Sequence, residues 1–411
     1  MSAVNFFLFM KIVRIIARLN VGGPARHVVW LTKELNDTEF QTSLLAGIVP
    51  EGEEDMSFFA DENGVAPVYI EQMSRELSPK DIISLWKIFR AISREKPDII
   101  HTHTAKAGTV GRIAALLYRI SSRKKVRIVH TFHGHIFHSY YGKLKTKIFL
   151  LIEKTLALLA TDKIITISQK QFEEIHHEFG IGKKEQFKIV PLGIDLSKFA
   201  AAETKKNILR KEIGAPDDEI LVGFVGRLTE IKNVSMLLKA AEIYREKKDL
   251  DLPRLKFVII GDGNLRNSLE RESRTLDLAE TVQFLGNRND TDVFYAGLDI
   301  VALVSLNEGT PLSLIEAMAN GKPVISTAVG GVVDLLGRVE TGNEDFKVCE
   351  RGIRVDEFSA ESFYKGLIYL AKSDKLRKEL AQSGIDFTNA QYDKKRLVED
   401  IKNLYRDLMG S

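Results

Sequence analysis

Two carboxylates, Glu308 and Glu316, lie in one otherwise apolar window of the 411-residue chain. Of all segments of the sequence, this window is the clearest candidate for a chemical role. The pattern predicts a helix with Thr310 as its N-cap, Pro311 at its first position and Gly321 just beyond its end. The free amides at such a helix start attract phosphate oxygens, and carboxylates accept hydrogen bonds from sugar hydroxyls. Helix stability explains the Thr, Pro and Gly. It does not explain two acids in a half-buried segment, because an unpaired buried charge is costly, so we interpret the window as a binding site.

Two cations, Arg227 and Lys232, follow the apolar run at residues 220–225. Fixed positive charges beside a helix start would neutralise the negative charge of a leaving diphosphate. Two unrelated surface bases would show the same spacing, so the spacing alone does not establish a diphosphate site.

In the N-terminal half, Gly22 and Gly23 follow the first apolar run, where their backbone can approach a ligand closely. Amides at the start of the next helix would attract an anion, although a tight strand-to-helix turn shows the same pattern.

Further on, His101, His103 and Lys106 follow another apolar run. We do not expect a metal on the two histidines, because no carboxylate is near them in the sequence. Lys106 is a candidate for a substrate phosphate or for a solvated surface position.

His133 lies just past the next apolar run, where an imidazole can donate a hydrogen bond to a sugar hydroxyl or accept a proton. A group of ordinary loop histidines is the alternative.

The stretch at 137–147 mixes tyrosines with lysines, and a loop of this kind can contact anionic lipid head groups. The alternative there is a solvated face above a core helix formed by the apolar stretch 148–160.

These residues need a scaffold, and the chain supplies short apolar runs that do not alternate with polar residues. Amphipathic stretches such as 82–94 and 234–247 lie between the runs. Such unalternating strands separated by helices are typical of parallel sheets covered on both faces. The runs are 11–19, 41–47, 67–70, 98–101, 126–131 and 163–167 in the first half, and 220–225, 256–260, 282–285, 299–304 and 323–327 in the second.

The runs therefore predict an α/β protein with two doubly wound parallel-sheet domains, Rossmann-like in topology and facing each other across a cleft. Pro191 and Gly193 mark the boundary between them, which divides the chain into residues 1–192, residues 193–393 and a last helix at 394–411. In doubly wound sheets, ligands bind outside the carboxyl ends of the strands, where the candidate residues above lie.

Composition restricts the protein class further. Hydrophobic residues make up 44% and charged residues 28%, as in a globular protein. Cys349 is the one cysteine, which excludes a disulfide framework and a thiolate zinc cluster and makes the cytosol the expected compartment. The net charge of +3 hides an asymmetry, because residues 80–147 hold fifteen bases and three acids. This asymmetry suggests an anionic partner. It does not suggest a nucleic acid, because no recognition motif accompanies it.

Together these residues resemble the retaining glycosyltransferases of family 4, historically glycosyl transferase group 1, which have the two-domain GT-B architecture. The resemblance covers most of the chain. Window 308–316 is similar to the family's Glu-x7-Glu motif, and segments 223–233 and 261–266 and the pair Gly330-Gly331 match flanking segments. Asp334 stands where many relatives carry Glu, and its role stays open.

The resemblance implies a role for each candidate residue. The N-terminal domain would bind the acceptor, the C-terminal domain would bind the nucleotide sugar, and the last helix would cross back to the N-terminal domain. The catalytic group would comprise His133, Arg227, Lys232 and Glu308. The donor would be bound by Gly22, Gly23, Arg288, Gly309, Thr310, Pro311, Leu312 and Glu316, and the acceptor by His103 and Lys106.

The implied reaction moves a sugar, with retention, from a UDP-linked donor to an acceptor in polysaccharide, glycolipid or related glycoconjugate synthesis. No metal and no cofactor are expected, because cations and amides would stabilise the leaving diphosphate, whose oxygen would take the acceptor's proton. The alternatives are a nucleotide-sugar epimerase of the same architecture and a non-catalytic nucleotide-sugar-binding subunit. The basic stretch adds a lipid-linked acceptor and peripheral contact with an anionic membrane at its inner face as expectations.

Overall fold

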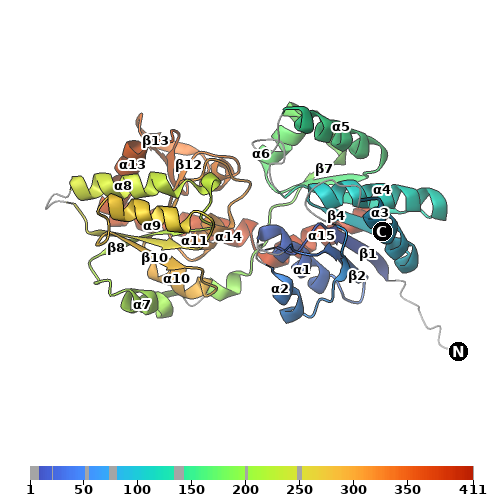
Figure 1. The fold of residues 1–411 in the computed structure, drawn as a ribbon, viewed down its shortest axis with the longest axis horizontal. Helices are drawn as coiled ribbons and strands as arrows, with labels where there is room; N and C mark the ends of the chain where they lie inside the picture. The colour runs from blue at the N-terminus through green and yellow to red at the C-terminus, as the bar shows by residue number, and fades with distance from the viewer. Residues whose placement is uncertain are drawn as a thin grey trace. The chain divides into compact units, whose positions relative to one another are not determined.

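The structure is a computed structural model that describes residues 9–20, 22–50, 55–73, 81–133, 143–199, 202–247 and 252–410, with the backbone alone for 143–145 and 203. The chain forms two compact units (Figure 1). Unit 1 comprises Met1–Gly193 and Lys395–Ser411, and unit 2 comprises Ile194–Lys394. Each unit has its own sheet and its own core.

The sheet of unit 1 has seven parallel strands in the order β3-β2-β1-β4-β5-β6-β7. The chain winds outward from β1 in both directions, so β1 and β4 flank the point where the winding reverses, as in a doubly wound fold. The strands are β1 (Met10–Ile16), β2 (Phe40–Gly47), β3 (Val68–Ile70), β4 (Ile99–His103), β5 (Arg127–Thr131), β6 (Lys163–Thr166) and β7 (Phe187–Ile189).

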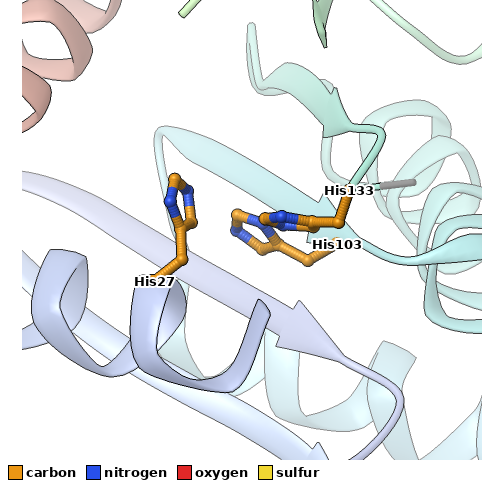
Figure 2. Close-up of side chains that lie close together, drawn as sticks. All are labelled: His27, His103 and His133. Carbon is orange, nitrogen blue, oxygen red and sulfur yellow. The ribbon is translucent and has the colours of Figure 1, made fainter. Parts of the chain in front are cut away.

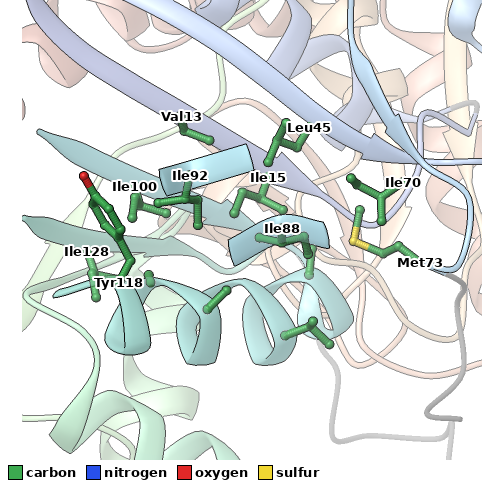
Figure 3. Packing of buried hydrophobic residues seen from close by; sticks show 14 of the residues in the cluster. Val13, Ile15, Leu45, Ile70, Met73, Ile88, Ile92, Ile100, Tyr118 and Ile128 are labelled. Atoms are coloured by element: carbon green, nitrogen blue, oxygen red, sulfur yellow. The ribbon is translucent and has the colours of Figure 1, made fainter. Parts of the chain in front are cut away.

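Helices cover both faces of this sheet, because alternate residues of β1 point to opposite sides. Val13 and Ile15 pack with helices α3 and α4 on one face (Figure 3). Ile12 packs with helices α1 and α15 on the other. The α-helices of unit 1 are α1 (Gly23–Glu34), α2 (Ser57–Glu62), α3 (Asp81–Glu95), α4 (Ala105–Ser122), α5 (Lys143–Leu159), α6 (Gln169–Phe172) and α15 (Lys394–Met409), and a π-helical stretch (Glu173–Glu178) continues α6.

The last helix, α15, is bound into unit 1 by apolar packing and by charge. Leu397, Ile401, Leu404 and Tyr405 lie in the core beside β1 and β4. At its C-terminal end, both oxygens of Glu39 accept hydrogen bonds from the Arg406 guanidinium, at 2.8 and 2.6 Å. The chain thus passes through the whole of unit 2 before its last helix completes the core of unit 1.

Helix α5 differs from the core helix expected at 148–160. Its buried side is narrow and includes Glu153, whose carboxylate bonds the buried Arg112 guanidinium at 2.5 Å. Ile148, Leu151, Leu158 and Leu159 are exposed instead. The reason is helical register, because apolar residues occur all around this helix and only one side can face the sheet. Most of the 137–147 loop lies outside the described residues, as do the neighbouring histidines at 135 and 138. Within the described part of the chain, no helix is long and apolar enough to cross a membrane.

Unit 2 repeats the doubly wound order and adds an edge that the sequence did not predict. Its eight strands run in the order β10-β9-β8-β11-β12-β15-β14-β13, and β14 pairs antiparallel with both of its neighbours. The strands are β8 (Ile220–Val225), β9 (Leu255–Ile260), β10 (Val282–Gly286), β11 (Ile300–Leu303), β12 (Val324–Thr327), β13 (Val339–Gly342), β14 (Lys347–Cys349) and β15 (Gly352–Val355).

The helices of unit 2 follow its strands in alternation up to β12, which keeps the sheet parallel as far as β15. They are α7 (Ala202–Glu212), α8 (Val234–Glu246), α9 (Arg266–Thr275), α10 (Thr291–Gly297), α11 (Leu312–Ala319), α12 (Val332–Leu336), α13 (Ala360–Lys372) and α14 (Asp374–Gln391).

The start of α11 differs from the prediction by one residue. Pro311, and not Thr310, occupies the N-cap position, with an extended backbone at φ −73° and ψ 112°. The Gly309 carbonyl accepts a 2.7 Å hydrogen bond from the Gly331 amide, which holds the preceding loop extended and delays the helix. The helix end was predicted correctly, because Gly321 follows the C-cap with a φ of +65°.

Candidate active site

The candidate site of unit 2 lies where the winding of its sheet reverses, between β8 and β11. The loops after these two neighbouring strands are joined by a 2.8 Å hydrogen bond from the Leu306 amide to the Ile231 carbonyl. This contact brings the cation that follows β8 to the acid that follows β11. Lys232 Nζ lies 2.5 Å from Glu308 Oε1, and Ser305 Oγ donates to the same oxygen at 2.6 Å.

The glycine pair after β12 supports this loop from behind. A side chain at position 331 would place its Cβ 2.2 Å from the Gly309 carbonyl oxygen, so the close approach requires glycine there. Thr327 Oγ1 also donates to the Ser305 carbonyl at 2.7 Å. Contacts from β12 and from the segments that follow β8 and β12 therefore hold the loop that presents Glu308 and Gly309. The pair Gly330-Gly331 thus has a structural role.

Glu316 lies on α11, where only 9% of the residue is exposed. The Tyr295 hydroxyl lies 3.3 Å from one of its carboxylate oxygens and 3.0 Å from the Ser313 carbonyl. No side chain caps the start of α11 among the described residues. Its first amides, at Leu312 and Ser313, therefore have no partner within the helix and can donate to an anion.

The two arginines expected at the site have different surroundings. Arg227 is exposed, and its guanidinium makes no hydrogen bond or ion pair with any residue that the structure describes. Arg288 is instead held by Asp290 and Glu212, whose oxygens lie 2.6 and 2.5 Å from its guanidinium nitrogens. These carboxylates raise the pKa of Arg288, so the group stays charged. A ligand would have to displace one of them to bind Arg288 directly.

Unit 1 presents its own candidate residues at the reversal between β1 and β4. Gly22 has a φ of +155°, which favours glycine, and Gly23 begins α1. Lys106, at the start of α4, is almost fully buried, and its Nζ lies 2.7 Å from an Asp81 oxygen. The ammonium group of Lys106 is therefore paired with a carboxylate and is not a solvated surface cation. Whether the residue serves an acceptor stays a prediction.

Three histidines from separate elements converge beside these residues: His27 on α1, His103 at the end of β4 and His133 just after β5 (Figure 2). His103 Nδ1 and His133 Nε2 are 3.0 Å apart. The sequence paired His103 with His101, but His101 turns to Tyr405 and Thr131, at 2.7 Å each. His27 was not predicted from the sequence, because it lies within a helical pattern. The one signal that could have indicated a site residue is its position in the first turn of the helix after Gly23.

All of these imidazoles are neutral because of burial. Desolvation lowers the pKa of His27, His101 and His103 well below the ordinary value, and it lowers that of His133 to about 3. His130, inside β5, is lowered in the same way and packs against Gly108, where a Cβ would lie 2.4 Å from its ring. Neutral imidazoles can both donate and accept hydrogen bonds, and their free nitrogens can bind metals.

Two doubly wound parallel-sheet units, with candidate binding residues at their reversal points, have the architecture of the GT-B fold. The family "Glycosyltransferase Family 4" matches residues 21–198, and "Glycosyl transferases group 1" matches residues 205–387. The two matches account for most of both units, so the chain belongs to the family 4, group 1 glycosyltransferases.

Named relatives agree with this assignment. The chain is 29% identical over 376 residues to the UDP-Gal:alpha-D-GlcNAc-diphosphoundecaprenol alpha-1,3-galactosyltransferase of Escherichia coli, covering 88% of this chain and 91% of the relative. It is 26% identical to the capsular polysaccharide biosynthesis glycosyltransferase CapM of Staphylococcus aureus, covering 83% and 85%. The solved structure of Anabaena HepE in complex with UDP has a TM-score of 0.78 at 19% identity, covering 97% and 100%, which shows the shared fold.

Proposed function

We propose that the protein transfers a sugar, with retention of configuration, from a UDP-linked donor to a lipid-linked acceptor in polysaccharide or glycolipid synthesis. The observation that carries the proposal is the Lys232–Glu308 pair beside the uncapped start of α11. The name of the Escherichia coli relative contains a UDP-linked donor and a diphosphoundecaprenol-linked acceptor. Solved structures of Anabaena HepE in complex with UDP and with UDP-glucose support the choice of donor.

The chemistry follows from where charge develops. As the bond between the anomeric carbon and the diphosphate breaks, the phosphate gains negative charge and the sugar gains positive charge. Lys232, the open cation Arg227 and the first amides of α11 stabilise the phosphate side. Glu308 accepts hydrogen bonds from the sugar hydroxyls, and Glu316 from the ribose. The leaving phosphate takes the acceptor's proton, so the protein supplies no nucleophile.

The same pair gives the site a way to exchange partners. Glu308 neutralises Lys232 while no diphosphate is bound, and this limits the cost of keeping both groups half-buried. An arriving diphosphate competes for the ammonium group, and the released carboxylate becomes available to the sugar. The proposal therefore predicts that both residues matter to transfer, for opposite ends of the donor.

Replacing Lys232 with Ala tests the diphosphate role. We expect transfer to fall by at least tenfold, equivalent to about 1.4 kcal/mol in the barrier. Lys239→Ala, an exposed lysine on α8, is the matched control and should leave transfer unchanged. Turnover by purified Lys232→Ala at the wild-type rate would contradict the role.

Two further measurements separate the finer parts of the proposal. Nuclear magnetic resonance of the first-formed product reports its anomeric configuration, and an inverted product would contradict retention. Transfer that persists in excess EDTA supports a metal-independent reaction, whereas transfer restored only by added Mg²⁺ or Mn²⁺ contradicts it. Donor consumption without an acceptor that yields an isomerised nucleotide sugar would point to an epimerase, and binding without turnover would point to a non-catalytic subunit.

A membrane-bound acceptor agrees with the outward face of α5, which carries apolar side chains and lysines. Ile148, Leu151, Leu158 and Leu159 are 50%, 67%, 65% and 58% exposed. Glu153 is the one acid of this helix, and it points inward to Arg112, so no acid lies on the outer face. We propose that this face lies against anionic lipid. Each apolar side chain that enters the interface contributes up to about 1.5–3 kcal/mol, and each nearby lysine about 1 kcal/mol.

Flotation with vesicles tests the contact. We expect the protein to float with vesicles rich in phosphatidylglycerol at low salt, and expect Leu151→Asp with Leu158→Asp to stay at the bottom of the gradient. Ile208→Asp, on an exposed apolar residue of α7 in unit 2, should still float. Flotation of the double variant like wild type would contradict α5 as the contact.

A further inference from the structure

The trio of His27, His103 and His133 has the composition of a transition-metal site (Figure 2). Each residue offers one ring nitrogen, and the three nitrogens lie within 4.8 Å of one another. The side chains come from a helix, a strand end and a loop, so the fold, and not local sequence, brings them together.

The nitrogens of this trio lack other partners. Both ring nitrogens of His27, Nε2 of His103 and Nδ1 of His133 make no hydrogen bond, although all are buried, among the residues that the structure describes. A buried polar atom without a partner costs about 1–3 kcal/mol, which a ligand can recover. Since burial keeps these imidazoles neutral, their lone pairs are available to a metal ion.

We propose that His27, His103 and His133 bind one divalent transition-metal ion, of the Zn²⁺ class, through three imidazole nitrogens with a fourth position open. Tetrahedral Zn²⁺ with Zn–N distances of about 2.0–2.1 Å places its nitrogens about 3.4 Å apart. His103 Nδ1 and His133 Nε2, which share a hydrogen bond, are 3.0 Å apart, and the ligand atoms of the trio lie within 4.8 Å of one another, so the two distances bracket this value. The metal would replace the hydrogen bond between His103 and His133.

A second layer of contacts already fixes one of the ligands. The ring of His101 stacks on that of His103, with centroids 4.1 Å apart and an angle of 32° between the planes. His101 is in turn held by Tyr405 and Thr131, so neither of its nitrogens is available to a metal. The ring contact therefore restricts rotation of the His103 side chain, one of the three proposed ligands.

The charge of Arg14 limits how tightly the ion binds. Arg14 pairs in register with His101, and besides burial its positive charge contributes to the lowered pKa of His27 and of His103. Such a buried guanidinium disfavours a second positive charge, so we expect micromolar affinity and not the much tighter affinity of a structural zinc site. The same charge would favour an anion, which makes phosphate the competing ligand in the test.

Metal binding has a consequence for transfer, and this part rests on the proposed function. The resemblance implies that His133 takes part in transfer, and a bound metal would occupy its ring nitrogen. We therefore expect bound metal to inhibit transfer that otherwise needs no metal.

Calorimetry and Co²⁺ absorption spectra of the full chain test the site without reference to activity. We expect one equivalent of Zn²⁺ to bind, and a tetrahedral Co²⁺ spectrum that added Zn²⁺ abolishes. His27→Gln and, at the half-buried position, His133→Gln should each weaken binding at least tenfold. His177→Gln, an exposed histidine outside the trio, is the control and should bind like wild type.

The outcomes distinguish the two proposals. No Zn²⁺ binding, binding unchanged in both folded trio variants, or heat from phosphate and none from Zn²⁺ would overturn the metal site. Binding at the trio that leaves transfer unchanged supports the site and counts against the role of His133. Loss of transfer in Lys232→Ala with intact Zn²⁺ binding supports both proposals independently.

Discussion

Removing one hydroxyl group, in Tyr405→Phe, should destabilise unit 1 far more than a surface change of the same size. Tyr405 lies on α15, and its hydroxyl accepts a hydrogen bond from Arg14 Nη2 at 3.4 Å and lies 2.7 Å from His101 Nδ1. Because a neutral imidazole carries one N–H, one nitrogen of His101 donates and the other accepts, so His101 hydrogen-bonds both Tyr405 and Thr131 in either tautomer. Three elements of unit 1 therefore share this one hydroxyl group.

The magnitude follows from burial. Arg14 is completely buried, and its Nε and Nη1 have no hydrogen-bond partner among the described residues. Loss of the bond to a charged group costs about 1.5–3 kcal/mol and loss of the bond to a neutral imidazole about 0.5–1.5 kcal/mol. Since the arginine bond is long, we expect a total of about 2–4 kcal/mol.

The assay can report on unit 1 alone, because both tryptophans of the chain, Trp30 and Trp86, belong to it. With an m-value of about 2 kcal/mol/M, the midpoint of urea unfolding followed by tryptophan fluorescence should fall by about 1–2 M. Tyr118→Phe is the matched control, because Tyr118 is buried in the same unit and its hydroxyl makes no hydrogen bond with a described residue. Equal midpoints for the two variants would refute the reasoning about Arg14.

Three other outcomes follow from the same contacts. Glu153→Leu should cost unit 1 about 3–5 kcal/mol, because it leaves Arg112 buried without its carboxylate, and Arg112→Leu added to it should recover part of the loss in the same urea assay. Gly331→Ala should weaken UDP binding about tenfold in calorimetry, because its Cβ would lie 2.2 Å from the Gly309 carbonyl oxygen and displace the loop. The four buried histidines of unit 1 and the half-buried His133 have lowered pKa values when folded, so the unfolded chain takes up protons first as the pH falls below about 6.5. The stability of unit 1 is thus fully present above this pH and should fall below it by about 1.4 kcal/mol per pH unit for each such histidine, as urea midpoints between about pH 7.5 and about pH 5.5 can check.

The parallel strands could be predicted from the sequence because strands buried on both faces are continuous apolar runs. The same signal failed at the far edge of unit 2. Strand β13 is exposed along its whole length, and β14 and β15 have three and four residues, too few for a hydrophobic pattern to register. Strand β7 in unit 1 is equally short and only partly buried. Short edge strands are defined by pairing with a neighbour that the sequence does not reveal.

Helix α5 shows a different limit. The sequence from 148 to 160 is apolar enough to predict burial, but composition does not say which side of a helix meets the sheet. Glu153 in fact decides the register, because its ion pair with Arg112 turns the acid inward and leaves Leu151 and Leu158 outside. That choice depends on an arginine 41 residues earlier in the chain.

At the candidate site, the sheet topology predicts which loops lie close together but not which side chains touch. Because β8 and β11 are adjacent, the loops that carry Lys232 and Glu308 had to lie close together, but their ion pair depends on side-chain conformations. The structure also shows that the two acids, which the sequence did not distinguish, have different partners. Glu308 faces a cation that a diphosphate can attract away, whereas Glu316 meets a tyrosine hydroxyl that a phosphate does not compete for.

In the proposed reaction, this difference accounts for an acid at each position. An acid that pairs with Lys232 keeps the cation oriented before the donor arrives, and it becomes a free hydrogen-bond acceptor only after the diphosphate has replaced it. An acid beside Tyr295 stays in place throughout, which suits a group that binds an unreacting hydroxyl. The window from Glu308 to Glu316 thus combines an acid that changes partner with an acid that does not. In the proposed reaction, the first would respond to developing charge, and the second would hold the donor in place.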